Sequence, residues 1–180
     1  MTAPPVPSAP GGVTVLGLGN VLMGDDAFGP HVIKVLESRY GFPPSVELLD
    51  GGTPGHELCA LLEGRDALIV VDAVKGSGEA GEIRIYDGED VTGCPPPLSV
   101  SPHEPGLKEA LLKADFAGHG PRTVLLVGVI PERIDTGGGL SDAVRGAVPG
   151  AVLEVLAALS RLGHGATEKE APGRPDLWWE

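Results

Sequence analysis

Apolar positions along the chain follow two spacings, one typical of buried strands and the other of amphipathic helices. Continuous or alternating aliphatic runs predict strands at 13–17, 46–50, 67–73, 82–86 and 123–129. Apolar residues repeated every three or four positions predict helices at 30–40, from Pro54 onward, at 106–115 and from Pro149 to 162. Because strands and helices alternate, we expect a three-layer α/β/α sandwich around a mostly parallel twisted sheet of about five strands.

Glycine and proline punctuate this pattern and also mark its limits. The 180 residues include 28 glycines and 18 prolines, of which ten lie in the two end segments 1–12 and 164–180. Both segments are polar and lack any period, so we interpret them as flexible tails. Between them, residues 13–163 are long enough for one domain. With 42% hydrophobic but only 4% aromatic residues, its core is expected to be aliphatic.

Charge and cysteine content narrow the function classes. The formal net charge of −12 disfavours phosphate backbones and anionic lipid, so neither nucleic acid nor a membrane surface is an expected partner. No apolar run approaches the 18 or so residues of a membrane helix, and the first residues lack the features of a signal peptide. The 2 cysteines, Cys59 and Cys94, are too few for a disulfide framework. We therefore expect a cytoplasmic protein without membrane insertion.

Three aspartates stand where predicted strands end, which is where open α/β sheets bind ligands. Asp26 follows Asp25 in a glycine-flanked loop after the first strand, Asp50 ends the second, and Asp72 closes the very apolar third. For Asp25 a solvated turn that caps the next helix is the preferred interpretation. Asp50 is expected either to cap the helix from Pro54 or to help position an extended peptide. Asp72 is either a cap or a site residue.

His103 is the histidine with the most distinctive setting, since it lies between Pro102 and Pro105 just ahead of a predicted helix. Stiff backbone on both sides suits a metal ligand, although an exposed loop histidine is the common alternative. If Asp26, Asp72 and His103 converge, two carboxylates and one imidazole form an N,O site suited to Ni²⁺, Zn²⁺ or Mn²⁺. Three protein ligands leave positions open for water or substrate.

Several other patterns do not support a site. Gly17-x-Gly19 lacks the third glycine of a dinucleotide fingerprint, because Leu22 stands there. His56-Glu57 begins like a zinc-protease motif, but Ala60 replaces the second histidine. Residues 135–137 match the Asp-Thr-Gly triplet of aspartic proteases without flanking strands, which indicates a glycine-rich loop. The remaining histidines at 31, 119 and 164 are interpreted as structural or solvated.

Five segments, taken in order, resemble the motifs of [NiFe]-hydrogenase maturation endopeptidases. The loop VLGLGNVLMGDDAFG resembles their opening motif, G-x-G-N-x-L-x-x-D-D/E-x-x-G. The other four are LLDGGT at 48–53, VVDA at 70–73, SPH at 101–103 and VGVIP at 127–131. The resemblance runs from about Val13 to Leu162, nearly all of the predicted domain, and five ordered motifs are far more specific than one.

The resemblance implies a peptidase, grouped with aspartic-type endopeptidases, that trims the C-terminal extension from the precursor of a hydrogenase large subunit. It implies cleavage after a basic residue once nickel has been inserted. The substrate's nickel would be recognised by Asp26, Asp72 and His103, a site that other divalent metals also fit. Asp26 matches a family position that takes Glu or Asp. Asp50 is the candidate for substrate binding.

The catalytic group that delivers the attacking water is not identified by the resemblance. A monomer is expected, and the two tails carry no family motif. Two alternatives remain open: a non-proteolytic metal chaperone that uses the same three residues, and a nucleotide- or small-molecule-binding α/β module.

Overall fold

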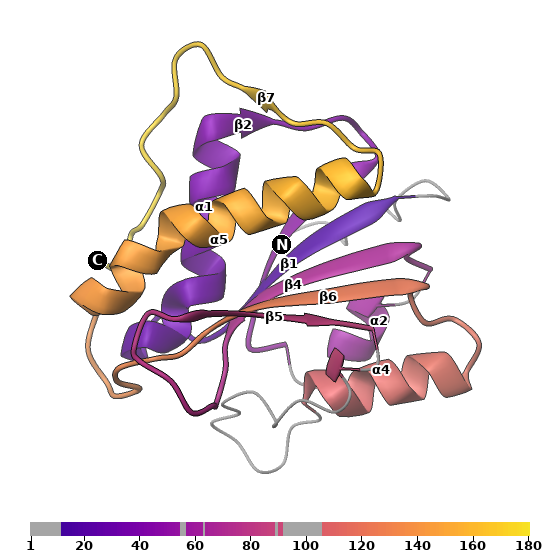
Figure 1. Cartoon of the computed structure of the whole chain (residues 1–180), viewed down its shortest axis with the longest axis horizontal. Coiled ribbons are helices and arrows are strands. Elements are labelled where there is room, and N and C mark those ends of the chain that lie inside the picture. The colour runs from indigo at the N-terminus through magenta and orange to yellow at the C-terminus, as the bar shows by residue number, and fades with distance from the viewer. Residues whose placement is uncertain (1–11, 55–56, 63, 89, 92–105) are drawn as a thin grey trace.

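The computed structural model describes residues 12–180 except 55–56, 63, 89 and 92–105. Within these residues five strands form one sheet in the order β3-β1-β4-β6-β5 (Figure 1). Their bounds are β1 Val13–Leu18, β3 Val46–Gly52, β4 Ala67–Ala73, β5 Ile83–Asp87 and β6 Thr123–Val129. Only the edge strand β5 runs antiparallel to its neighbour. All five predicted strands are therefore confirmed, and so is the mostly parallel sheet.

Helices cover both faces of this sheet. On one side lie α1, Phe28–Arg39, and α5, Asp142–Arg161, and on the other lie α2, Leu58–Leu62, and α4, Leu107–Phe116 (Figure 1). The buried side chains form two corresponding aliphatic clusters, one on each face. Each cluster draws alternate residues from the same strands, as Ile69 and Val70 of β4 illustrate. This arrangement confirms the predicted three-layer sandwich.

The last helix begins well before the position expected from the sequence. Ser141 is its N-cap, and the Ser141 hydroxyl accepts a hydrogen bond from Val144 N at 3.4 Å. Pro149, the predicted first helical residue, instead lies in the interior of α5. The helix tolerates it there, although a proline inside a helix removes one backbone hydrogen bond. The expected start at Pro149 was therefore wrong by two turns.

The helix expected from Pro54 corresponds to α2, which in the described residues spans Leu58–Leu62. Glu57 N donates to Pro54 O at 2.9 Å, and residues 55–56 lie outside the described residues. Cys59 on α2 is half-buried against the apolar cluster, as expected, whereas Cys94 lies outside the described residues.

Two glycines bring the first strand and the first helix into backbone contact. A Cβ on Gly17 would lie 2.6 Å from Gly29 O, and a Cβ on Gly29 would overlap both Leu18 O and Val71 O. Any larger residue at either position would force β1 and α1 apart. The short 3-10 helix η1, Gly24–Ala27, therefore enters α1 directly beside the carboxyl ends of β1 and β4.

The C-terminal segment packs against the domain instead of extending as a flexible tail. Its strand β7, Thr167–Glu168, pairs with β2, Tyr40–Gly41, and the chain then returns along α1 toward the start of α5 (Figure 1). Trp179 is only 8% exposed, and the carboxylate of Glu180 lies 2.9 Å from Arg145 Nη1. The expectation for residues 164–180 is thus corrected by contacts that an aperiodic, polar sequence does not reveal. Most of the predicted N-terminal tail lies outside the described residues.

Among the described helices, α5 alone is long and apolar enough to cross a membrane by length and composition, with a mean hydropathy of 1.4 in its most apolar window. Core helices meet the same criterion, and in this fold α5 contributes Val144, Ala151 and Val155 to the cluster that it shares with α1 and the sheet.

Candidate functional site

Asp26 is held inside η1 at the carboxyl end of β1. Its side chain is 3% exposed, and Oδ2 accepts a hydrogen bond from Asn20 N at 2.7 Å. The turn is tight at Gly19, whose φ is 132° and where a Cβ would overlap Asp26 O. Only glycine fits such a position. The loop therefore wraps closely around this carboxylate, as the spacing of glycines suggested.

Asp72 is the penultimate residue of β4 and is likewise buried, with 6% of its surface exposed. Its Oδ1 accepts a hydrogen bond from Ala73 N at 2.8 Å. Burial raises its pKa well above the ordinary value, and the negative charge of Asp26 raises that pKa further. Burial also raises the pKa of Asp26, while the hydrogen bond from Asn20 lowers it. The fold has thus brought together two of the three predicted metal ligands.

Such a pair of carboxylates favours a cation between them. Two like charges removed from water destabilise each other, and either protons or a metal ion relieves the repulsion. Within the described part of the chain, neither Asp26 nor Asp72 forms an ion pair with a basic side chain. The donor set therefore fits a divalent metal, and it is also suited to hold a proton.

The third predicted ligand, His103, lies outside the described residues. Within those residues no group of three or more His, Cys, Asp or Glu side chains is placed to hold a metal. The structure thus brings Asp26 and Asp72 together and leaves the position of His103 a prediction.

Asp50 also lies toward the carboxyl end of its strand, but its exposure to solvent differs from that of the buried pair. It is exposed, pairs in register with Gly17 of β1, and its Oδ1 accepts a hydrogen bond from Gly52 N at 3.2 Å. Gly52 O in turn accepts from Gly19 N at 2.9 Å, which ties this turn to the loop of Asp26. Asp50 therefore hydrogen-bonds within the end of β3, and the residue is exposed to solvent.

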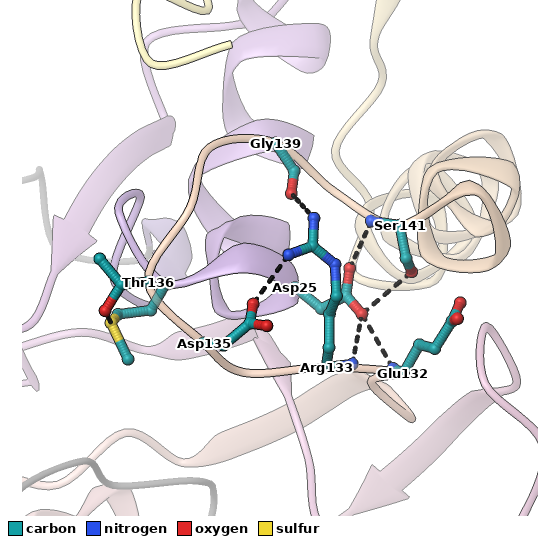
Figure 2. A network of polar contacts seen from close by, with 8 residues as sticks. Asp25, Glu132, Arg133, Asp135, Thr136, Gly139 and Ser141 are labelled. Atoms are coloured by element: carbon teal, nitrogen blue, oxygen red, sulfur yellow. Dashed lines mark hydrogen bonds and ion pairs between the residues drawn. The ribbon is translucent and has the colours of Figure 1, made fainter.

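Asp25, which the sequence suggested to be a solvated cap, is instead fully buried. Its two carboxylate oxygens accept hydrogen bonds from Glu132 N at 2.8 Å, Arg133 N at 3.0 Å, Ser141 N at 2.7 Å and Ser141 Oγ at 3.0 Å (Figure 2). All these donors belong to the segment between β6 and α5. No local sequence signal indicates them, because they lie more than one hundred positions away in the chain.

The Asp-Thr-Gly triplet at 135–137 lies in this same segment and is a loop, as expected. Asp135 pairs with Arg133 at 2.7 Å and is exposed (Figure 2). Of the other histidines, His31 is buried beside Glu180, and His164 Nδ1 lies 2.9 Å from Ser45 Oγ.

Comparison with known proteins agrees with the architecture and with the motifs. Residues 30–158 match the family model described as hydrogenase maturation protease. The chain is 40% identical over 163 residues to the hydrogenase 2 maturation protease of Escherichia coli K12, covering 88% of this chain and 97% of that protein. It is 37% identical over 159 residues to the hydrogenase expression/formation protein HupM of Azotobacter chroococcum, covering 88% and 76% of the two chains.

Solved structures give the same result in three dimensions. The hydrogenase maturating endopeptidase HybD from E. coli superposes with a TM-score of 0.80 at 39% identity, covering 88% of this chain and 98% of its own. A hydrogenase 2 maturation peptidase from a thaumarchaeote superposes with a TM-score of 0.64 at 33% identity, covering 83% and 98%. With a matching fold, a matching family model and a relative 40% identical that aligns over 97% of its length, the chain belongs to the hydrogenase maturation protease family and is a peptidase.

Proposed function

We propose that this peptidase removes the C-terminal extension from the precursor of a [NiFe]-hydrogenase large subunit, and that it recognises the nickel already bound in that precursor. The observation that carries the proposal is the buried pair Asp26 and Asp72, which lies at the ligand-binding edge of the sheet and faces no basic side chain among the described residues. The family membership supplies the reaction and the class of substrate.

The nickel ion belongs to the substrate in this proposal. Asp26 and Asp72 contribute carboxylate oxygens and His103 contributes an imidazole nitrogen, a donor set that Ni²⁺ and other divalent ions accept. Two carboxylates and one imidazole form a modest, open site that alone holds metal weakly, and its two carboxylates repel each other when they are ionised. Docking of a nickel-loaded precursor relieves this repulsion, and this relief couples cleavage to correct metal loading. The nickel supplies positive charge that orients the scissile segment and polarises groups bound to it.

Asp50 is proposed to position the substrate peptide. Its carboxylate is exposed on the edge strand β3, next to the turn that contacts Gly19, so it is available to a basic residue of an extended segment. The net charge of −12 suits recognition of such a residue and disfavours nucleic acid. A monomer that acts in the cytoplasm completes the proposal.

The experiment compares cleavage of nickel-loaded and nickel-free precursor by the purified protein. We expect the loaded precursor to be cut and the free one to remain intact, and Asp26→Asn, Asp72→Asn and His103→Ala each to abolish cleavage. Asp66→Asn is the matched control for Asp72, because Asp66 precedes the same strand at its opposite end. Equal cleavage of both precursors would remove nickel recognition from the proposal. An intact extension after incubation with the loaded precursor would favour a metal chaperone instead.

A further inference from the structure

We propose that Asp25 is a positioning residue for metal recognition: it locks the segment between β6 and α5 onto η1 and thereby fixes Asp26 opposite Asp72. The inference rests on the proposed role of Asp26 and Asp72 as metal ligands. It assigns a function to a buried carboxylate that belongs to the opening motif but that the proposed reaction does not use directly.

The carboxylate of Asp25 is saturated with hydrogen-bond donors. Oδ1 accepts from Ser141 N, and Oδ2 accepts from Glu132 N, Arg133 N and Ser141 Oγ, all within 3.0 Å (Figure 2). Ser141 is also the N-cap of the 20-residue helix α5, so the positive end of the helix dipole faces this carboxylate. A buried negative charge with these partners needs no cation. Asp25 is therefore a structural anion and differs in kind from its neighbour Asp26.

Backbone hydrogen bonds join the same two segments, residues 22–25 and residues 132–141, and we call this set of contacts the clamp. Asp25 N donates to Arg133 O at 3.1 Å, Gly24 N donates to Gly137 O at 3.2 Å, and Gly137 N donates to Leu22 O at 3.3 Å. Gly24 has a φ of 56°, a conformation that glycine adopts at little cost. Residues 22–25 are thus hydrogen-bonded to residues 133–137, while the carboxylate of Asp26 accepts a hydrogen bond from Asn20 N.

Because of these contacts, the position of Asp25 determines the position of Asp26. The two residues share a peptide bond inside a single 3-10 turn, which the hydrogen bond from Asp26 N to Met23 O closes at 3.2 Å. Any shift of Asp25 would therefore displace the carboxylate of Asp26 relative to Asp72. Partners that orient metal ligands in this way typically change metal affinity or activity about 10- to 100-fold when they are removed.

Asp25→Asn is the informative substitution, because it preserves the shape of the side chain. Whichever way the amide is oriented, its NH₂ group faces at least one buried N–H of the clamp, and that donor loses its partner. Asp142→Asn is the matched control. It removes the same charge from the first turn of α5, but Asp142 is exposed and lies outside the clamp.

The test is a titration of the full-length protein with Zn²⁺, a diamagnetic divalent probe, followed through the NMR signal of the Asn20 amide, which donates to Asp26. We expect Asp25→Asn to require about 10- to 100-fold more Zn²⁺ than wild type at a temperature where it is fully folded. Asp142→Asn should match wild type. Thermal unfolding measured in parallel separates lost stability from lost positioning.

Unchanged Zn²⁺ affinity in a folded but less stable Asp25→Asn protein would overturn the inference, since Asp25 would then be only structural. If Asp25→Asn does not fold, Ser141→Ala decides the matter. It removes one hydrogen bond to Asp25, so an affinity about 2- to 10-fold weaker is expected, and unchanged affinity contradicts the proposal. A wild-type Asn20 signal that never responds to Zn²⁺ would instead count against the metal site itself.

Discussion

Asp26 and Asp72 lie on different elements, η1 and β4, yet the charge of Asp26 helps to raise the pKa of Asp72. Both carboxylates are buried, so each is costly to ionise, and together they cost more than either alone. A protein that keeps such a pair loses stability, and in the proposed site a cation would recover it. That trade leads to predictions about stability as well as activity.

Asp72→Asn is expected to stabilise the metal-free protein at neutral pH while it abolishes cleavage. The amide removes a buried negative charge, keeps an oxygen for Ala73 N, and offers an NH₂ group to Asp26. Because the buried charge of Asp72 is unfavourable in the folded protein, the free energy of unfolding at neutral pH should rise when that charge is removed. Urea denaturation measures it, with Asp66→Asn, expected to change stability by less than about 0.5 kcal/mol, as the control. A loss of stability in Asp72→Asn would contradict this account.

Stabilisation by a divalent metal is expected to increase with pH. Because the pKa values of Asp26 and Asp72 are raised above 3.8, the folded protein retains protons that the unfolded chain has already released. The contribution of this pair to the free energy of unfolding therefore falls as pH rises through the raised pKa values and is constant above them. Metal must displace the same protons, so the increase in Tm with Zn²⁺ should be larger at about pH 7.5 than at about pH 5. The double variant Asp26→Asn/Asp72→Asn should show no increase at either pH.

Gly19→Ala is expected to damage both fold and site. Its φ of 132° is unfavourable for alanine, and the new Cβ would overlap Asp26 O. We expect a loss of about 2–4 kcal/mol in stability together with loss of cleavage. Gly146→Ala is the control, because Gly146 lies inside α5 with open space where a Cβ would stand. This variant should increase the free energy of unfolding by about 0.5–1 kcal/mol. Thermal unfolding of both variants gives the comparison, and equal effects would refute it.

His31 is expected to make the protein less stable in mild acid. Burial lowers its pKa below 6.5, and Arg145 lowers it too, against the opposing effect of Glu180, whose Oε1 lies 3.3 Å from His31 Nδ1. The unfolded chain therefore takes up a proton that the folded protein resists, and stability falls as pH drops below about 6.5. His31→Gln should lose less stability than wild type between about pH 7.5 and 5.5. If the free energies of unfolding of the two proteins fall equally between these pH values, His31 does not contribute to the loss of stability in acid.

The strands were predictable because the residues that define each of them are adjacent in the sequence. In 67–73 and 123–129 every position needed for a buried strand is present in the sequence itself, and the structure reproduces both ranges. The edge strand was also recognisable, since its apolar residues alternate with polar ones. The same locality explains Asp72, because an aspartate at the end of so apolar a strand has to lie at the ligand-binding edge of the sheet.

The errors involve contacts between distant parts of the chain. Pro149 resembles a helix start, but the cap at Ser141 prevails because Asp25 binds it from the other end of the sequence. Trp179 in a polar, proline-containing segment gives no sign of the contacts that bury it. Asp25 and Asp26 are identical and adjacent in sequence, and only the folded positions of residues 132–141 and of Asp72 give them different roles.

The close contact between Gly17 and Gly29 has a consequence for engineering. These glycines fix both ends of the loop that carries Asp26 by direct contact of main chain with main chain, without relying on side chains at the rim of the site. The exposed residues 75–79, between β4 and β5, take no part in that contact. These exposed residues can therefore be exchanged without disturbing that contact, whereas the loop from Gly17 to Gly29 has to be transplanted or kept as one unit.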